Sequence, residues 1–192
     1  NEVWQTIKQG IPVVLGRNGL GWGRGFDIDY NTVDRNAPVK KEGDGRAPSG
    51  IFGINLAFGF PEKPHYVKLP YIKLTDHIEC VDDVASVYYN RIIDNSKVEV
   101  HDWKSSEKMS TIDVYRAGVL VEHNTGSVEK GCGSCIFLHV WDSPDKPTSG
   151  CTAMSEDDLA FLIGWLDPAK APLLLQFTED IYKRIKNDLS LP

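Results

Sequence analysis

The stretch His139–Leu159, HVWDSPDKPTSGCTAMSEDDL, contains the features that decide the fold of this chain. His139 lies within Ile136–Trp141, a run of apolar, β-branched and aromatic residues that predicts a strand. Cys151 follows in a Ser-Gly-Cys-Thr turn. Ser155 then precedes Glu-Asp-Asp and apolar residues at helical spacing, which predicts a capped helix. The segment is therefore expected to form a strand, a loop and a helix, with a histidine on the strand and a cysteine before the helix.

Outward from this segment, the pattern predicts a mainly β domain, because short apolar runs bounded by glycine, proline or asparagine are typical of strands. Strands are predicted at Ile11–Leu15, Ile51–Ile54, Val119–Glu122 and Pro172–Phe177, and helices at 82–93, 104–109 and Thr178–Leu189. The glycine-rich stretch Gly16–Gly25 lacks the spacing of a nucleotide-binding loop and is predicted to be a mobile or tightly turned surface loop. With 192 residues and no repeat or long linker, the chain is expected to be one domain, residues 1–192.

The composition argues against several classes of partner. The net charge is −6, and the adjacent basic pairs Lys40-Lys41 and Lys183-Arg184 have acidic neighbours, which argues against nucleic acid and anionic membrane surfaces. No apolar run reaches the roughly 18 to 20 residues that a transmembrane helix needs. The first residue is Asn1 rather than Met, which is consistent with a processed protein whose signal peptide has been removed. We expect a monomer.

The four cysteines are Cys80, Cys132, Cys135 and Cys151. Cys132-Gly-Ser-Cys135 has the CxxC spacing of a redox pair or of half a zinc site, but a second pair of ligands is lacking in the sequence. The motif precedes a predicted strand, whereas a thioredoxin-like motif begins a helix. Structural cysteines are therefore favoured, with one disulfide involving Cys80 if the protein is exported, and a CxxC redox protein remains an alternative.

Cys151 and His139 form a candidate nucleophile and base. A reactive cysteine must be accessible and attack as a thiolate, and a histidine twelve residues away on a strand can come within reach of it. Gly150 allows backbone N–H groups to turn toward a carbonyl oxygen, as in an oxyanion hole. The alternative is that both are ordinary core residues, and the spacing alone does not decide between the two interpretations.

The segment Gly133–Trp141, followed by Lys146–Met154, resembles the active-site segment of the L,D-transpeptidase catalytic domain, the YkuD family. Members carry a histidine on a strand, then a loop, then Ser-His-Gly-Cys, a small or apolar residue and Arg or Asn. The resemblance extends to other stretches of the chain, which are 11–25, 40–54, 81–94, 102–109 and 164–177. It implies a mainly β fold, the L,D-transpeptidase β-sandwich with peripheral α-helices.

By this resemblance Cys151 is the nucleophile and His139 its base, and backbone amides around Ser149 and Gly150 bind the oxyanion. The implied reaction is L,D-transpeptidation of peptidoglycan stem peptides. The cysteine attacks the carbonyl after the L-centre of the third stem residue, and an amine of a second stem resolves the thioester. The resemblance implies no metal and no organic cofactor. Donor and acceptor stem peptides as partners imply a cell-envelope location, periplasmic or extracellular.

The sequence departs from the family pattern at two positions. Ser149 occupies the slot that usually holds the second histidine, and Ala153 the slot of Arg or Asn. These departures leave the nucleophile and the base in place but put substrate specificity in doubt. Weaker candidates for substrate contact, with surface or packing roles as the alternative, are His123, Tyr115, Trp141 and Arg46.

Two alternatives follow from the same residues. If water rather than an amine resolves the thioester, the protein is an L,D-carboxypeptidase or a related amide hydrolase. If the departures at Ser149 and Ala153 abolish turnover, it is a non-catalytic peptidoglycan-binding module.

Overall fold

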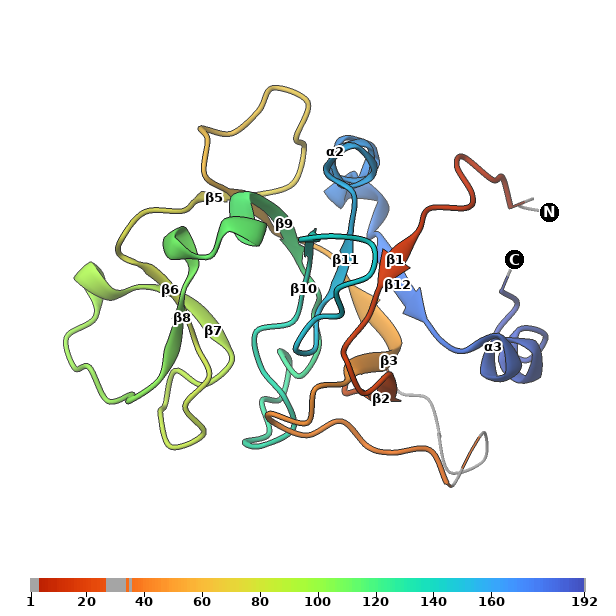
Figure 1. Ribbon diagram of the computed structural model, residues 1–192, viewed down its shortest axis with the longest axis horizontal. Helices are drawn as coiled ribbons and strands as arrows, with labels where there is room; N and C mark the ends of the chain where they lie inside the picture. The colour runs from red at the N-terminus through yellow and green to blue at the C-terminus, as the bar shows by residue number, and fades with distance from the viewer. Residues whose placement is uncertain (1–3, 27–33, 35, 192) are drawn as a thin grey trace.

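The computed structural model describes residues 4–26, 34 and 36–191, and these residues form three β-sheets with helices around them (Figure 1). The large sheet has six strands in the order β1 (Val13–Val14), β11 (Thr152–Met154), β10 (Phe137–Val140), β9 (Ala117–Leu120), β4 (Ala57–Gly59) and β5 (Tyr71–Lys73). The second sheet has the order β12 (Leu173–Gln176), β3 (Ala47–Gly53) and β2 (Leu20–Trp22). The third has the order β7 (Arg91–Asp94), β6 (Ile78–Val81) and β8 (Ser106–Lys108).

Two α-helices and four short 3-10 helices complete the described structure. The α-helices are α2 (Glu156–Trp165) and α3 (Glu179–Ile185). The 3-10 helices are η1 (Asn95–Lys97), η2 (Met109–Thr111), η3 (Asp113–Arg116) and η4 (Pro168–Lys170). The prediction of a mainly β fold with peripheral helices is therefore confirmed.

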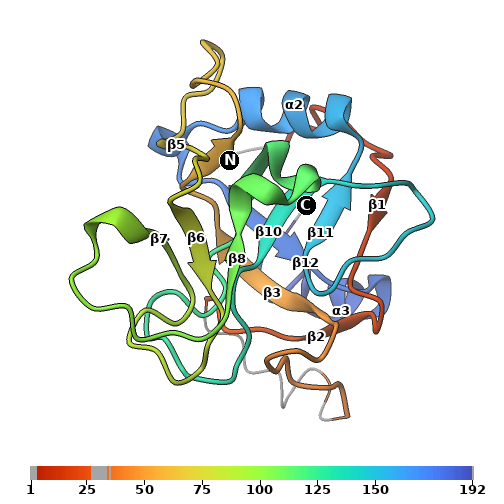
Figure 2. The same cartoon turned by 60° about the vertical axis from the view of Figure 1, so that its left-hand side comes forward.

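The main core lies between the large sheet, the second sheet and α2 (Figure 2). Leu138 and Val140 of β10 point into this core, where they join Phe52 of β3. Leu159 and Ile163, four residues apart on one face of α2, join the same core. This packing of two sheets on one apolar layer is the sandwich arrangement.

Strand β10 separates this core from a second one. Because side chains alternate across a strand, Phe137 points to the face opposite Leu138. Phe137 packs with Phe58 and Tyr115, whose ring centroids lie 5.0 and 5.3 Å from its own. His139, two residues after Phe137, shares this second face.

The third sheet lies to one side of the large sheet (Figure 1, left) and is attached to it by a disulfide. The bond joins Cys80 on β6 to Cys135, two residues before β10. Within the sheet, the buried carboxylate of Glu79 accepts hydrogen bonds from Asn95, from the Trp103 indole and from Ser106, and pairs with Lys108. A buried charge must be paired or hydrogen-bonded, and here every partner comes from the sheet or the segments beside it.

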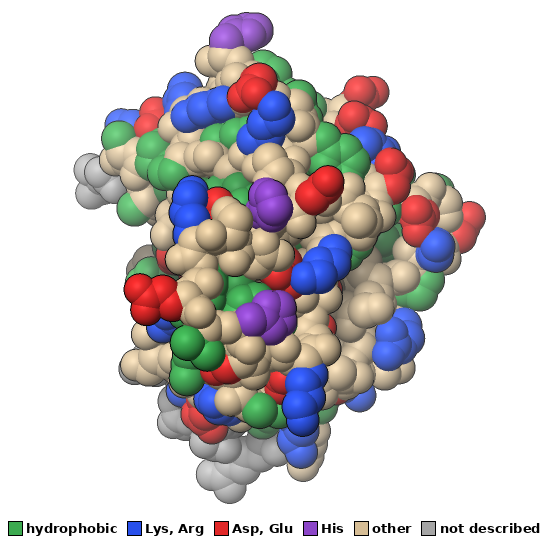
Figure 3. All heavy atoms as spheres, turned by 90° about the vertical axis from the view of Figure 1, so that its left-hand side faces the viewer, with side chains coloured by type: hydrophobic (Ala, Val, Ile, Leu, Met, Phe, Trp, Pro, Cys, Tyr) green, Lys and Arg blue, Asp and Glu red, His purple; other side chains and the backbone are tan. Residues whose placement is uncertain are grey.

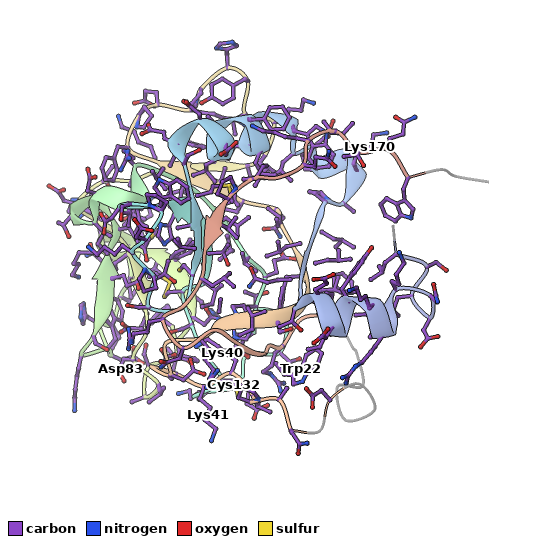
Figure 4. All side chains as sticks on the ribbon, turned by 45° about the vertical axis from the view of Figure 1, so that its right-hand side comes forward. Trp22, Lys40, Lys41, Asp83, Cys132 and Lys170 are labelled. Atoms are coloured by element: carbon purple, nitrogen blue, oxygen red, sulfur yellow. A yellow bond between two sulfur atoms is a disulfide. The ribbon has the colours of Figure 1, made fainter. Side chains whose placement is uncertain are left out.

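The local sequence signals for the two α-helices are confirmed. The Ser155 hydroxyl accepts from the Asp158 amide at the start of α2. The Thr178 hydroxyl accepts from the Ile181 amide at the start of α3, which ends at Ile185, four residues before the predicted end. Trp22 packs beside α3 against Ile181 and Ile185 (Figure 4).

Three predictions of local structure are wrong. Residues 82–93 form turns and the start of β7, because the Asp83 and Asp102 carboxylates take amide hydrogens of Ala85 and Val87 that a helix would use. Residues 104–109 form β8 and the start of η2, because pairing with β6 overrides the local helical tendency. The glycine-rich segment 16–25 contains β2, which pairs in parallel with β3 and buries Trp22.

No helix within the described ranges is long and apolar enough to cross a membrane. On the face formed by the third sheet, acidic and basic side chains are interspersed (Figure 3).

Candidate active site

A cavity of about 450 Å³ opens on the second face of β10. Its lining includes Cys151, His139, Tyr115, Trp141 and Glu107. Cys151 directly precedes β11, His139 lies on β10, and Trp141 directly follows β10. Tyr115 belongs to η3 and Glu107 to β8. The fold therefore brings together the two residues of the candidate dyad at one cavity.

Strand pairing explains how Cys151 and His139 reach the same face. Strands β10 and β11 are parallel, with Leu138 opposite Thr152 and His139 opposite Ala153. Cys151 precedes β11 and lies beside Phe137, whose backbone N–H donates to Cys151 Sγ at 3.3 Å. The Cys151 thiol in turn donates to the Cys135 carbonyl at 3.5 Å.

The turn before Cys151 is held by the Thr148 hydroxyl. This hydroxyl donates to the Cys151 carbonyl at 2.6 Å and accepts from the Gly150 amide at 3.2 Å. The neighbouring Ser149 is exposed, and its hydroxyl accepts from Arg17 Nη1 at 3.3 Å. The backbone of the turn is thus fixed, whereas the Ser149 side chain faces solvent.

Burial keeps Cys151 a thiol at neutral pH. Desolvation raises the pKa of the thiol to about 12, and the Glu107 carboxylate adds to this increase. The Phe137 N–H, which donates to the sulfur, and the Tyr115 hydroxyl act in the opposite direction and lower the pKa of the thiol. Because these opposing contacts are the weaker effect, a base has to take the proton before the sulfur can attack.

His139 is buried in a form that can act as that base. Its Nδ1 lies 2.8 Å from the Val140 carbonyl, which can only accept, so Nδ1 carries the proton and Nε2 has a free lone pair. Burial lowers the pKa of His139 below its usual value, which keeps the ring neutral. Among the described residues no hydrogen bond joins His139 to Cys151, and the two share the cavity rather than a direct contact.

Tyr115 and Glu107 complete this side of the cavity. The Tyr115 hydroxyl donates to Glu107 Oε2 at 2.7 Å, and Tyr115 packs in the same buried cluster as Cys151. The Tyr115 ring packs edge-to-face on the His139 ring, with centroids 5.3 Å apart. Sequence reasoning placed Tyr115 among the weak candidates and missed Glu107, because nothing in its local pattern separates it from a surface glutamate.

Comparison with known protein families identifies the family of the chain. The model of the L,D-transpeptidase catalytic domain, YkuD, matches residues 3–174 of the chain. The chain belongs to this family. No match to a curated protein and none to a solved structure was found.

The structure shows what surrounds the two positions that depart from the L,D-transpeptidase pattern. Ala153 is fully buried between β1 and β10, where it pairs with Val14 and with His139. Because paired residues point to the same face, a long side chain at Ala153 would lie beside the His139 ring. Ser149, by contrast, is exposed, and its hydroxyl contacts Arg17. The two departures therefore differ in kind: one is in the packed wall of the site and the other is at its solvent edge.

Lys40 is a second cavity residue that sequence reasoning missed. Its side chain is buried, and its Nζ donates to Asp44 Oδ1 at 2.6 Å and to the Lys41 carbonyl at 2.7 Å. Nζ lies 3.9 Å from the position that a Cβ on Gly150 would take, and its charge lowers the pKa of Cys151. In Figure 4 Lys40 lies at the same end of the molecule as Cys132.

The remaining candidate residues divide between the cavity and the surrounding structure. Trp141 lines the cavity. Arg46 is outside the lining and donates from Nη1 to the carbonyls of Asn18 and Leu20, which fixes the loop before β2. His123 is also outside the lining, and both of its ring nitrogens have protein partners. Arg46 and His123 therefore have structural roles that explain them without a substrate.

The disulfide corrects the CxxC interpretation. Cys135 is bonded to Cys80, so it does not form a redox pair with Cys132, which is a free cysteine. The expectation of structural cysteines with one disulfide at Cys80 is confirmed. Within the described residues there is no group of three or more His, Cys, Asp or Glu side chains placed to hold a metal ion.

Proposed function

We propose that the protein is a cysteine-dependent L,D-transpeptidase acting on peptidoglycan stem peptides, with Cys151 as nucleophile and His139 as base. The observation that carries this proposal is the shared cavity, in which a buried thiol and a neutral histidine with a free Nε2 face the same space. Membership of the L,D-transpeptidase family supports the substrate class. The third-residue carbonyl of a tetrapeptide stem is the proposed electrophile.

The acylation half of the reaction uses one proton. His139 Nε2 takes the proton of the Cys151 thiol as Sγ attacks the carbonyl carbon and forms the S–C bond. The C–N bond then breaks, and the terminal D-residue leaves with the proton from His139. The product of this half is a thioester on Cys151.

The second half transfers the acyl group. An amine of another stem attacks the thioester carbonyl and gives a proton to His139, and the C–S bond breaks. The sulfur regains the proton, so the enzyme returns to its starting state with a new amide crosslink formed. If water takes the place of the amine, the same steps give a carboxypeptidase.

Backbone amides around Ser149, Gly150 and Cys151 are the proposed donors to the oxyanion. The Gly150 amide donates to the Thr148 hydroxyl in this structure. It therefore has to leave that partner when negative charge develops on the substrate oxygen, which is where such a donor acts most strongly.

The disulfide supports a location in the cell envelope, periplasmic or extracellular. Disulfides persist in oxidising compartments, and the Cys80–Cys135 bond closes a separation of 55 residues in this chain. The stem peptides, donor and acceptor, are available in the same compartment.

Intact mass spectrometry tests the proposal. The protein is incubated with a tetrapeptide stem or with a carbapenem, and an adduct is expected that is lost in Cys151→Ala and retained in Cys132→Ala. The matched cysteine variant separates the proposed nucleophile from the other free thiol. An absence of adduct with both reagents would contradict the proposal and favour a binding module.

Product analysis then identifies the acceptor. Purified stem peptide is incubated with and without a second amine-bearing stem. A crosslinked product that appears when the amine is added supports the transpeptidase, whereas a trimmed stem in both samples indicates the carboxypeptidase.

A further inference from the structure

The Tyr115 hydroxyl lies between a carboxyl group and the candidate nucleophile. It donates to Glu107 Oε2 at 2.7 Å, and Tyr115 and Cys151 belong to the same buried cluster and line the same cavity. Glu107 is held in this position by strand pairing, because β8 pairs with β6 and places Glu107 opposite Cys80. The disulfide from Cys80 to Cys135 attaches this strand to the chain just before β10. The three groups thus form a row, carboxyl, phenol and thiol, inside the cavity.

A phenol has one proton to donate, so it cannot serve both neighbours. When Glu107 is ionised, the carboxylate is acceptor only and takes the Tyr115 proton. The Tyr115 hydroxyl then has no proton to donate to the sulfur, so a thiolate on Cys151 lacks this donor, whereas the protonated thiol keeps its hydrogen bond to the Cys135 carbonyl. When Glu107 is neutral, its own O–H can donate to the Tyr115 oxygen, and the phenol proton is free to bind a thiolate.

The surroundings of Glu107 allow both forms near neutral pH. Burial raises the pKa of Glu107 to about 7, the hydrogen bond from Tyr115 lowers it, and the acidic side chains Asp82 and Glu42 raise it further. Both carboxylates line the same cavity, and Asp82 Oδ1 is buried without a hydrogen-bond partner. Lys40 also lines this cavity, and its charge lowers the pKa of the Cys151 thiol.

We propose that Glu107 is a positioning residue that controls Cys151 through Tyr115: the ionised carboxylate holds the phenol proton and suppresses the thiolate, and the neutral carboxyl releases that proton to the sulfur. This inference rests on Cys151 being the nucleophile of the proposed function, and it leaves His139 as the group that accepts the thiol proton. The net change is a reorientation of two hydrogen bonds and one protonation of Glu107 from solvent.

Alkylation of Cys151 measures this control without requiring turnover. In a Cys132→Ser background, the rate of modification by iodoacetamide is followed by intact mass between about pH 5.5 and 8.5, for the parent and for Glu107→Gln. A Gln is neutral at every pH and can donate to the Tyr115 oxygen. The ratio of the Glu107→Gln rate to the parent rate is expected to be close to one at pH 5.5. It is expected to rise to about tenfold at pH 8.5, which corresponds to about one unit in the thiol pKa.

The matched control is Asp82→Asn, which removes a carboxylate of the same cavity that does not bind Tyr115. It is expected to change the alkylation rate less than Glu107→Gln does at pH 8.5. Tyr115→Phe tests the route, because without the hydroxyl only the charge of Glu107 acts on the sulfur, so the effect of Glu107→Gln is expected to shrink in that background.

Two results would overturn the inference: a rate ratio that is the same at all pH values, which is what a purely structural role of Glu107 gives, or an equal effect of Asp82→Asn. Its failure is distinguishable from failure of the proposed function, since alkylation reports the state of the thiol, whereas acylation by a stem peptide or carbapenem reports catalysis.

Discussion

Two buried histidines, His139 and His123, show how similar surroundings can produce different roles. They are 6% and 1% exposed, and burial lowers the pKa of both. His139 uses only Nδ1, which donates to the Val140 carbonyl. In His123, Nδ1 accepts from the Arg24 amide at 3.1 Å and Nε2 lies 2.9 Å from the Cys132 carbonyl. A free ring nitrogen facing a cavity, rather than burial or residue type, marks the candidate base.

The packing around His123 reinforces this difference. A Cβ added to Gly23 would lie 2.9 Å from its Nδ1, and one added to Gly133 would lie 2.9 Å from its Nε2. Phe52 covers the ring edge-to-face, with centroids 5.9 Å apart. The site of His123 thus leaves no space at either nitrogen, and the ring serves to join the segment after β2 to the Cys132 loop.

The largest effect is expected when His139 is replaced. We predict that His139→Asn lowers the rate of acylation by a stem peptide or carbapenem by about 10²- to 10⁴-fold, because a general base contributes in this range. The thermal unfolding midpoint of the same variant is expected to change little, so that the loss of rate is not explained by unfolding. Acylation is followed by intact mass and unfolding by circular dichroism.

The matched control is His123→Asn, for which the opposite pattern is expected. An Asn cannot satisfy both the Arg24 amide and the Cys132 carbonyl, and a buried group left without a partner costs about 1–3 kcal/mol. The folded fraction should retain most of its acylation rate. If His123→Asn abolished acylation in fully folded protein, the comparison between the two histidines would be broken.

A smaller effect is expected in the pH dependence of stability. Burial lowers the pKa of His123 from 6.5 to about 4, so the unfolded chain binds its proton more tightly than the folded protein. The buried, neutral His123 ring therefore contributes fully to the free energy of unfolding above about pH 6.5, and this contribution is lost as the pH falls toward 4. Its size is at most about 3.5 kcal/mol, because the pKa falls by about 2.5 units and each unit corresponds to about 1.4 kcal/mol.

Urea unfolding at several pH values, for the parent and for His123→Asn, measures this contribution. The difference in unfolding free energy between the two proteins should narrow as the pH is lowered from about 6.5. Groups that titrate equally in both proteins, such as Glu79 and Glu107, cancel in that difference. If the difference in unfolding free energy stayed constant down to pH 4.5, protonation of His123 would not contribute to the pH dependence of stability, and the prediction would be wrong.

The parts of the fold that local patterns specify were predicted from the sequence. β10 and α2 are encoded by contiguous residues, an apolar β-rich run and a capped amphipathic segment. β8 and β2 were not predicted, because each forms a strand only by pairing with a strand that is distant in sequence, β6 for β8 and β3 for β2. A short polar run such as Ser106–Lys108 has no pattern of its own that distinguishes an edge strand from a helical turn.

The site divides in the same way. Cys151 and His139 could be predicted because they lie twelve residues apart on one strand–loop unit whose motif resembles a known family. Glu107 and Lys40 could not, because they reach the cavity only after separate segments have folded against β10. The hydrogen bonds that give His123 a structural role likewise come from Arg24 and Cys132, which local sequence does not place beside it.

The smallest effect is expected when a histidine is introduced at position 149, at the solvent edge of the site. Ser149→His restores the residue that the L,D-transpeptidase pattern usually holds. Because Ser149 is exposed and its hydroxyl faces Arg17, we predict that the acylation rate changes by no more than about twofold, the range of a surface substitution. The measurement is the acylation rate by intact mass at several pH values, with Arg17→Gln as the control that removes only the Ser149 contact. An increase well beyond this range that follows the protonation of an exposed histidine would show that a base at the edge can assist the buried His139. That result would weaken the rule that the base must be a buried histidine with a free ring nitrogen.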